Sequence, residues 1–390
     1  MGYKEKRAYL NEIRKRYRKA QKELKTKILD EFCVVCNYHR KHAIRLLGAP
    51  FRRKKSKIRK RGSKSIYNYS CVLKPLVEIW LATDQMCSKK LKIALPIWLP
   101  FYECEYGKLP IEARDKLLKM SSATIDRLLK PNKAKYKRRG LSGTKPGTLL
   151  KNQIPIRTDN WDIAKPGYCE ADTVAHCGNS LAGDFVWSLT MTDIFSGWTE
   201  NRAVWGKGSE GVVTQIKDIE KRLPFRLLGF DCDNGSEFLN YHLIRYFSNR
   251  PKSMMVQFTR TRPYHKNDNA HVEQKNWTHV RQLLGYDRFE NKAIVSLLND
   301  LYGNDFSLLK NYFCPNMKLV SKERINSKYR KKYDTPKTPF QRLLSCNDIP
   351  SDTKEKLIRT YKQLNPFILR KNIESKLKNI FKLVIPRLNT

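Results

Sequence analysis

Three segments with the pattern of β-strands follow one another in YCEADTV (residues 168–174), FVWSLTMT (185–192) and WTENRAVW (198–205). Each segment is rich in β-branched and aromatic residues, and turn-forming residues such as Gly178 and Gly197 separate them. Strand-like segments of this length joined by short turns predict an antiparallel meander of three strands.

The chain after this meander alternates between helix and strand patterns, judged from the spacing of its apolar residues. The expected elements are a helix at Glu210–Arg222, a strand at Arg226–Cys232, a helix at Glu237–Phe247, a strand at Val256–Thr259 and a long helix at Asn269–Leu284. Three strands followed by this alternation are the order of a ribonuclease-H-like fold, in which helices cover a mixed five-stranded sheet. We therefore expect such a core over residues 165–290.

The chain before this core has helical patterns and predicts a multidomain protein with both α and α/β parts. Residues 1–64 are expected to form a helix-turn-helix region with a basic linker, because Lys25–Leu47 reads as two helices broken near Asn37. The second of these helices would present basic and polar side chains to a DNA groove, namely His39, Arg40, Lys41 and Arg45. The alternative is an ordinary helical hairpin with a solvated basic face.

A run of cations without any acid follows at residues 52–61 and includes Arg53 and Lys54. Such charge density repels itself unless a partner neutralises it, so we expect this linker to contact DNA phosphates.

Residues 65–150 are expected to form a second helical region with its own basic linker. Tyr69–Leu99 has a helical pattern, and Glu112–Leu129 repeats the helix-turn-helix signal, with Ser121 and Ser122 as helix caps. Another basic stretch at residues 133–139 contains Arg138, a further candidate for DNA contact.

The last part of the chain, residues 300–390, is expected to be a basic C-terminal region with two helices near its end. Its basic cluster consists of Lys322, Arg324, Lys328, Arg330, Lys331 and Lys332.

The composition favours a nucleic-acid partner. The 390 residues contain 78 Lys and Arg against 37 Asp and Glu, a formal charge of +41, while 40% hydrophobic residues suffice for a buried core. A polyanion is the natural counterpart of this excess positive charge. The sequence has no long apolar run and no secretory signal, so we expect a protein of the cytosol or nucleoid without a membrane partner.

The ten cysteines are irregularly spaced, and we expect them to be reduced and mostly buried. Cys33, Cys36, His39 and His42 together offer ligands for zinc. They lie closer together in the chain than the two ligand pairs of most zinc modules, so a packed helical face is the preferred interpretation.

Three acidic residues stand where a ribonuclease-H-like fold could bring them together: Asp172 in the first strand, Asp233 after the fourth strand and Glu273 near the start of the long helix. Carboxylates are the ligands that Mg²⁺ prefers, and paired divalent ions catalyse phosphoryl transfer. Glu170 shares a strand face with Asp172, so the sequence leaves open which of the two faces the site. Singly, each acid could equally be a surface, turn or helix-start residue.

The segments DNGSEF (residues 233–238) and RPYHKNDNAHVE (262–273) resemble the core of integrase-type transposases, relatives of the retroviral integrases. The resemblance covers roughly residues 165–290. It implies an Asp-Asp-Glu triad at Asp172, Asp233 and Glu273, which would hold Mg²⁺ or Mn²⁺, as two ions.

The same resemblance implies cleavage of double-stranded DNA followed by strand transfer, carried out by a homo-oligomer that holds two element ends. It also implies that Asn269 contacts the substrate, and His271 faces either the site or solvent. Lys275 and Arg281 on the same helix are candidates for phosphate contact. Asp193 and Glu237 are expected to be structural or supporting acids. A nuclease that only cuts, and a DNA-binding protein without catalysis, are the alternative functions.

Overall fold

The structure is a computed structural model that describes residues 1–49, 67, 70–135, 163–206, 208–232, 238, 241–260, 270–325 and 328–384. Five of the predicted site residues lie outside these ranges: Arg53, Lys54, Arg138, Asp233 and Asn269. Glu237, expected to be a structural or supporting acid, also lies outside them. The chain divides into two compact units, Met1–Ser65 and Ile66–Thr390. The regions expected at residues 65–150, 165–290 and 300–390 fall within the second unit, apart from Ser65.

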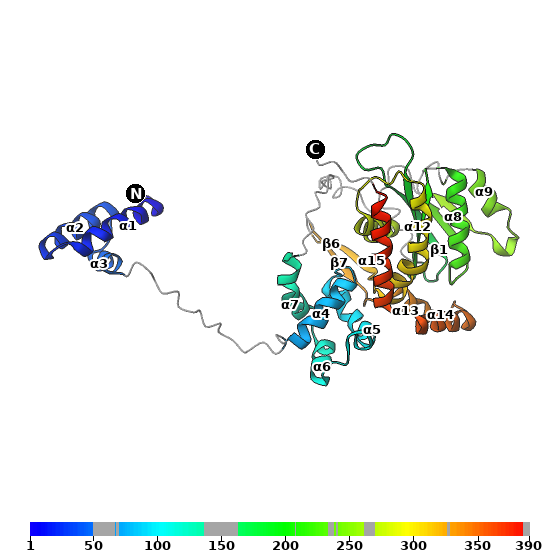
Figure 1. Ribbon diagram of the computed structural model, residues 1–390, viewed down its shortest axis with the longest axis horizontal. Coiled ribbons are helices and arrows are strands. Elements are labelled where there is room, and N and C mark those ends of the chain that lie inside the picture. Colours follow the sequence, from blue (N-terminus) through cyan, green and yellow to red (C-terminus); the bar gives the residue numbers. More distant parts are fainter. Residues whose placement is uncertain are drawn as a thin grey trace. The chain divides into compact units, whose positions relative to one another are not determined.

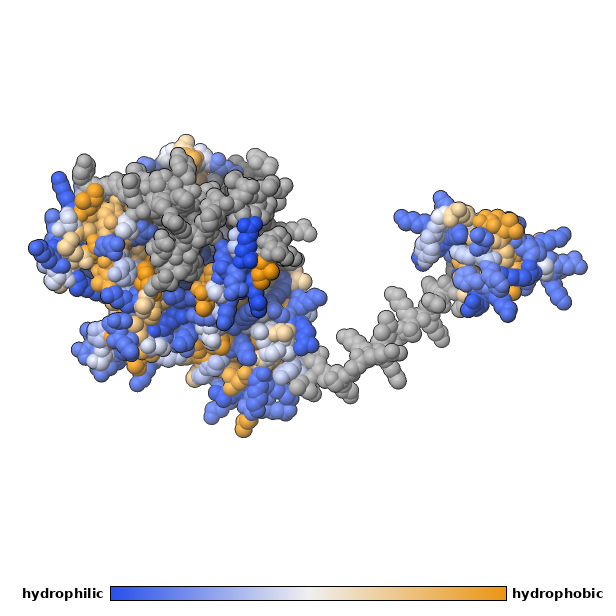
Figure 2. Space-filling model, turned by 180° about the vertical axis from the view of Figure 1, so that it is seen from behind, coloured by the Kyte–Doolittle hydropathy of each residue, from blue (hydrophilic) through white to orange (hydrophobic). Residues whose placement is uncertain are grey.

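The first unit contains the helices α1 (Tyr3–Lys19), α2 (Lys22–Cys36) and α3 (Arg40–Gly48). Asn37 ends α2 in the left-handed conformation (φ 52°, ψ 52°), which places the break where the sequence predicted it. The buried core of this unit includes Ile13, Phe32 and Leu47, one from each helix. On the face shown in Figure 2, hydrophilic side chains surround one hydrophobic patch of this unit.

The second unit is built on a five-stranded sheet with the order β3-β2-β1-β4-β5. Its strands are β1 (Tyr168–Ala175), β2 (Val186–Asp193), β3 (Thr199–Trp205), β4 (Gly229–Cys232) and β5 (Gln257–Arg260). β1 pairs with β2, and β2 with β3, in antiparallel orientation, while β4 and β5 run parallel to β1. The expected meander and mixed sheet are confirmed, and this arrangement is consistent with a ribonuclease-H-like core.

Helices cover both faces of the sheet (Figure 1). One face packs on α8 (Ser209–Arg222) and α9 (Tyr241–Ser248) through a cluster that includes Ala171, Ile216 and Leu243. The other face is covered by the helix predicted at 269–284, which consists of α10 (Ala270–Lys275), a π-helical segment η4 (Asn276–Arg281) and α11 (Gln282–Leu284). Cores on both faces explain why the central strands carry apolar residues at odd and even positions alike.

Four helices precede the sheet in the second unit: α4 (Ser70–Ala82), α5 (Ser88–Tyr106), α6 (Ile111–Lys119) and α7 (Ser122–Lys135). The single helical stretch expected at Tyr69–Leu99 is thus two helices, because Asp84 and Gln85 adopt positive φ values of 56° and 58° and break the chain direction. The pair α6 and α7 begins near the residue predicted from the second helix-turn-helix signal, but α7 continues to Lys135 and so extends past the end predicted at Leu129.

The remaining elements of this unit are η3 (Lys252–Met254), α12 (Ala293–Leu301), η5 (Tyr302–Phe306), η6 (Leu309–Phe313), β6 (Leu319–Ile325), β7 (Lys328–Tyr333), α13 (Pro339–Leu344), α14 (Ser351–Gln363) and α15 (Pro366–Lys382). The two helices expected near the end of the chain are α14 and α15. The basic cluster forms an antiparallel β-ribbon, which the sequence analysis did not predict.

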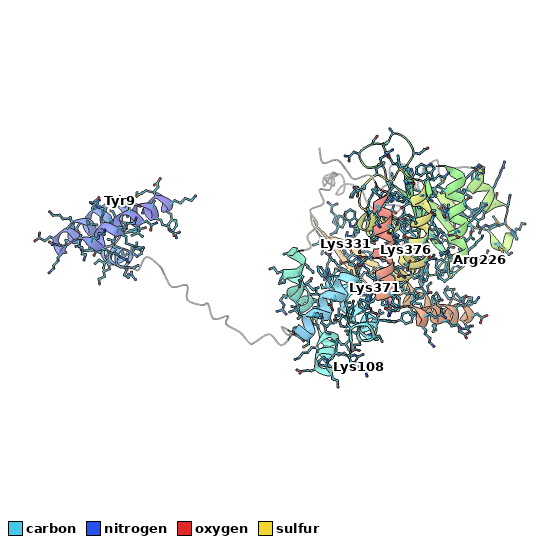
Figure 3. All side chains as sticks on the ribbon, in the orientation of Figure 1. Tyr9, Lys108, Arg226, Lys331, Lys371 and Lys376 are labelled. Carbon is cyan, nitrogen blue, oxygen red and sulfur yellow. The ribbon has the colours of Figure 1, made fainter. Side chains whose placement is uncertain are left out.

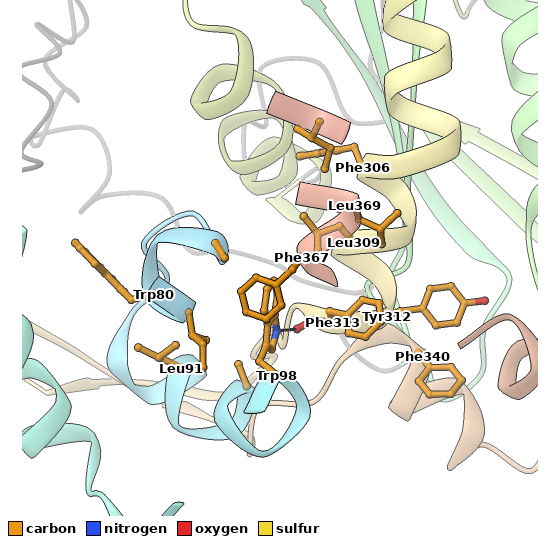
Figure 4. Packing of buried hydrophobic residues seen from close by; sticks show 14 of the residues in the cluster. Trp80, Leu91, Trp98, Phe306, Leu309, Tyr312, Phe313, Phe340, Phe367 and Leu369 are labelled. Atoms are coloured by element: carbon orange, nitrogen blue, oxygen red, sulfur yellow. Dashed lines mark hydrogen bonds between the residues drawn. The ribbon is translucent and has the colours of Figure 1, made fainter. Parts of the chain in front are cut away.

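Aromatic packing joins the helices before the sheet to the end of the chain (Figure 4). Trp98 of α5 donates a hydrogen bond from Nε1 to the Phe313 carbonyl of η6 at 2.9 Å. The Trp98 ring packs edge-on against Phe367 of α15, with 5.3 Å between the ring centres. A buried aromatic ring with its N–H satisfied contributes both apolar area and a specific orientation. Residues 70–135 are therefore packed into the second unit by contacts that lie far apart in the sequence.

The ten cysteines are all unpaired, but only four are buried, so the expectation that most would be buried was wrong. Cys71, Cys87 and Cys104 are exposed on α4, before α5 and on α5. None of the helices in the described part of the chain is long and apolar enough to cross a membrane.

Candidate catalytic site

Acidic side chains gather on one face of the central strands. Glu170 and Asp172 alternate along β1 with Cys169 and Ala171, which belong to the core under α8 and α9. Both acids therefore lie on the opposite face, under α10. Asp231 of β4 is aligned with Glu170 across the parallel strand pair and shares this face.

Glu170 attaches the first turn of α10 to β1. Its Oε2 accepts hydrogen bonds from the backbone N–H groups of His271 and Val272, each at 2.9 Å. First-turn N–H groups have no partner within their own helix, so a carboxylate at this place both satisfies them and complements the helix dipole. Glu170 thus holds in place the segment that carries Glu273.

Burial raises the pKa of Glu170 to about 8, with a further rise from Asp231, while the hydrogen bond from the Val272 N–H opposes the shift. Its second oxygen, Oε1, is buried and has no hydrogen-bond partner among the described residues. A buried carboxyl oxygen in this state is the kind of group that a proton or a cation would complete.

Asp172 is tied to the same helix one turn further on. Asn276 donates from Nδ2 to Asp172 Oδ2 at 2.7 Å, and Asp172 Oδ1 accepts from the Thr173 N–H at 2.7 Å. Asn276 is the first residue of the π-helical segment η4. Widened turns of this kind are frequent at functional sites, and here the segment begins with the side chain that reaches β1.

Glu273 lies between these two attachments, on α10, and its side chain is exposed. From its position one turn after Glu273, Trp277 is expected to lie in the core, but this expectation is wrong because Trp277 is 49% exposed. The inward face of the helix consists of Val272, Asn276 and Val280, which are buried. Trp277 follows Glu273 by one turn and therefore shares its outward face.

Two other residues predicted on this helix, Lys275 and His271, are partly buried. Lys275 donates from Nζ to the Gly197 carbonyl at 3.2 Å, and burial lowers its pKa to about 7. His271 is partly exposed, and burial lowers its pKa to about 4.

Asp193 has the structural role that the sequence analysis expected. It accepts from the backbone N–H groups of Gly167 (2.8 Å) and Ser196 (2.6 Å), and burial raises its pKa to about 6. It thereby closes the turn that leads from β2 toward β3.

The four candidate DNA contacts of the first unit are all exposed: His39, Arg40, Lys41 and Arg45. Arg40 forms an ion pair with Asp30 of α2, and His39 caps α3 by accepting from the Lys41 N–H. Their exposure agrees with the prediction, and contact with DNA stays a prediction.

The proposed zinc ligands have separate surroundings. Cys36 is buried in the core of the first unit, and the His42 ring meets Tyr38 edge-on at 5.0 Å. Among the described residues, no three His, Cys, Asp or Glu side chains form a group that could hold a metal ion, but Asp233 lies outside those residues.

The structure thus connects Asp172 with the helix of Glu273 and adds two residues to the site. Asn276 went unnoticed in the sequence, although its place three residues after Glu273 on a helix with an inward apolar face was a usable signal. The role of Glu170 in capping α10 is set by a contact between residues about a hundred positions apart and had no local signal.

No protein-family model matches the chain. A solved structure with some likeness is the catalytic core domain of BIV integrase, at 14% identity and a TM-score of 0.26, covering 45% of this chain and 91% of that one. The uncharacterized protein y4rM of Sinorhizobium fredii (strain NBRC 101917 / NGR234) is 39% identical over 335 residues, which are 85% of this chain and 92% of y4rM. Identity of this degree over nearly both whole lengths means that the chain belongs to the same family as y4rM.

Proposed function

We propose that this chain is a transposase or integrase that cleaves double-stranded DNA and joins the freed end to a target, with Asp172, Asp233 and Glu273 as its catalytic carboxylates. The observation that carries the proposal is the double attachment of the Glu273 helix to the Asp172 strand. Glu170 holds the helix before Glu273, and Asn276 reaches Asp172 after it.

Asp233 enters the proposal from the chain order and the resemblance of residues 233–238. It is the residue directly after Cys232, the end of β4, and Cys232 is paired with Ala171, the neighbour of Asp172. The two strands that lead to Asp172 and Asp233 are thus adjacent and parallel, and parallel strands end at the same edge of a sheet.

The donor chemistry fits hard divalent cations, Mg²⁺ or Mn²⁺, because Glu170, Asp172 and Asp231 share one face of the sheet. Two further oxygens on this side, Glu170 Oε1 and Asn276 Oδ1, are buried without a hydrogen-bond partner among the described residues. The residues that would hold the ions are Asp172, Asp233 and Glu273. Bound there, the ions would activate the attacking oxygen and stabilise the leaving one. Asn276 would fix the orientation of the Asp172 carboxylate, and Glu170 would fix the position of Glu273.

The proposed partner is double-stranded DNA. The net charge of +41 supports it, as do the exposed cations of α3. Since two DNA ends must be held at once for joining, we propose that the active form is a homo-oligomer.

The test uses the full chain with supercoiled DNA and with duplexes that carry the sequence flanking the gene, in the presence of Mg²⁺ or Mn²⁺. We expect Asp172→Asn, Asp233→Asn and Glu273→Gln each to lower the cleavage rate by at least about 100-fold, since each removes charge from the reacting centre. DNA binding should persist in all three variants.

Glu210→Gln is the matched control, because Glu210 lies on α8, over the other face of the sheet, with a side chain 80% exposed. It should cleave like the parent. A parent chain without cleavage, or an Asp172→Asn variant that still cleaves, would contradict the proposal. Duplexes with pre-cut ends distinguish a transposase from a plain nuclease. A nuclease cuts the duplex but joins none of these ends to a target.

A further inference from the structure

The β6–β7 ribbon is an isolated two-stranded element on the side of the second unit away from α8 and α9 (Figure 1). Among the described residues neither strand pairs with another sheet. Most of its side chains are exposed, including Ile325 (50%) and Tyr333 (46%). A two-stranded ribbon is only marginally stable by itself, so an exposed one is more readily explained if a binding partner covers it.

The register divides the basic residues of the ribbon between two faces. Lys322 lies directly opposite Lys331, and Arg324 opposite Tyr329. These four residues share one face, which we call the cationic face, because residues opposite each other in an antiparallel pair project to the same side. The position of Lys322 Nζ, 4.5 Å from the centre of the Tyr329 ring, agrees with this assignment. Figure 3 labels Lys331 on β7.

The other face carries Glu323 opposite Arg330, Ser321 opposite Lys332 and Ile325 opposite Lys328, so it has as many basic residues as the cationic face. Its charges are therefore mixed, whereas the cationic face has no acid among these residues. Directly opposed like charges such as Lys322 and Lys331 destabilise a strand pair. Burial lowers the pKa of Lys322, and the charge of Lys331 lowers it further.

We propose that the β6–β7 ribbon binds double-stranded DNA by inserting its cationic face into the major groove. Two strands lie about 5 Å apart, and a ribbon with its side chains fits a groove about 12 Å wide but not the minor groove of about 6 Å. Seven residues of β6 span roughly 20 Å, a substantial part of one DNA turn of about 34 Å. Phosphates would neutralise the opposed lysines, and Tyr329 would lie toward the bases.

Lysines on exposed strands also prevent edge-to-edge aggregation, which is the competing explanation for this charge. That role needs charges on the ribbon but gives no reason why one face has an acid and the other has none. It also predicts no difference between DNA and other polyanions.

The experiment compares two double variants with equal loss of charge, Lys322→Gln/Lys331→Gln on the cationic face and Arg330→Gln/Lys332→Gln on the other. Both are made in the full chain that carries Asp172→Asn, and the affinity for a DNA duplex is measured by fluorescence anisotropy over a salt series. Binding is thus read without cleavage, so the result is independent of the proposed catalysis and rests on the proposed function only for the choice of DNA.

We expect the Lys322→Gln/Lys331→Gln chain to lose about ten-fold in DNA affinity and to lower the slope of log affinity against log salt by about 1.8, at roughly 0.9 for each lost phosphate contact. The other double variant should show less than half of either change. A midpoint of thermal unfolding equal to or above that of the parent shows that the cationic-face variant is folded, because removing the opposed lysines relieves repulsion.

An RNA duplex of the same sequence is the second control, because its major groove is too deep and narrow for a ribbon. Loss of affinity should be confined to DNA. Equal losses from the two faces, equal losses for DNA and RNA, tighter binding to anionic vesicles than to DNA, or aggregation with unchanged DNA affinity would each overturn the proposal.

Discussion

Glu170 and Asp172 are two residues apart on one strand face, yet their surroundings divide their roles. Glu170 is buried, its pKa is raised to about 8 by burial, and two backbone N–H groups bind one of its oxygens. Asp172 is partly exposed, and it accepts hydrogen bonds from the side-chain amide of Asn276 and from the Thr173 N–H. The surroundings of Glu170 suit a residue that holds a helix in place, and those of Asp172 suit a residue that contacts a substrate.

A buried histidine beside this site makes stability depend on pH. His176 shares a 2.8 Å hydrogen bond between Nε2 and Ser188 Oγ, and its ring stacks on Phe289 at 4.6 Å. Burial, and next the charge of Arg281, lower its pKa from 6.5 to about 3. Its neutral form is therefore the one that packs in the fold.

We expect the free energy of unfolding to fall less steeply with decreasing pH in His176→Gln than in the parent. Above pH 6.5 the histidine is neutral in both states, but between pH 6.5 and about 3 the unfolded chain holds a proton that the folded chain does not. Stability therefore falls as the pH falls, by up to about 1.4 kcal/mol per pH unit for this one group. Urea unfolding of parent and variant at several pH values measures the difference, and parallel curves would contradict the assignment.

At the scale of the element, the helix that carries Glu273 is held at its start by Glu170 and, after a change to π-helical geometry, by Asn276. A π-helical turn displaces the following residues relative to a regular helix, so the two attachments need not follow a 3.6-residue spacing. Contacts with β1 therefore hold the segment at two places along its length.

We expect Glu170→Ala to loosen the start of α10, whereas Glu170→Gln keeps it attached. Alanine leaves the N–H groups of His271 and Val272 without their acceptor, while glutamine retains an acceptor oxygen. The cost is about 1–3 kcal/mol for the buried Val272 donor and less for the partly buried His271 donor. Hydrogen exchange at these two amides should accelerate in the alanine variant only. Equal protection in all three chains would mean that Glu170 does not hold the helix.

On the scale of the whole molecule, the two compact units have separate hydrophobic cores. The core of the first unit involves only residues 9–47, and the cores of the second begin at residue 67. Cores that share no residue lose their packing independently.

We expect Phe32→Ala to abolish folding of the first unit and leave the second unit intact. Phe32 is fully buried, and truncating such a side chain costs about 3–5 kcal/mol, close to the whole stability of a unit of this size at about 0.1 kcal/mol per residue. Calorimetry of the full chain should show two transitions in the parent and only the transition of the second unit in the variant. A shift of both transitions would show that the units fold together.

Much of the fold and part of the site were predictable from local patterns. The meander, the helix break at Asn37, the last two helices and the strand that carries Asp172 follow from side-chain periodicity and turn residues, which depend on neighbours in the chain. The break at Asp84 was not predicted, because it depends on the left-handed conformation of Asp84 and Gln85. Neither residue is a glycine, the residue type that usually signals this conformation in a sequence.

The sequence by itself determined the polyanion-binding character, the order of strands and helices, and the acids that could form a site. Only the tertiary structure decided that Glu170 caps α10, that Asn276 meets Asp172, that Trp277 faces outward and that the C-terminal basic cluster is a two-faced ribbon. The reason is physical: periodicity reports which side of an element is buried, but which residue lies across from it depends on packing and register between segments far apart in the chain.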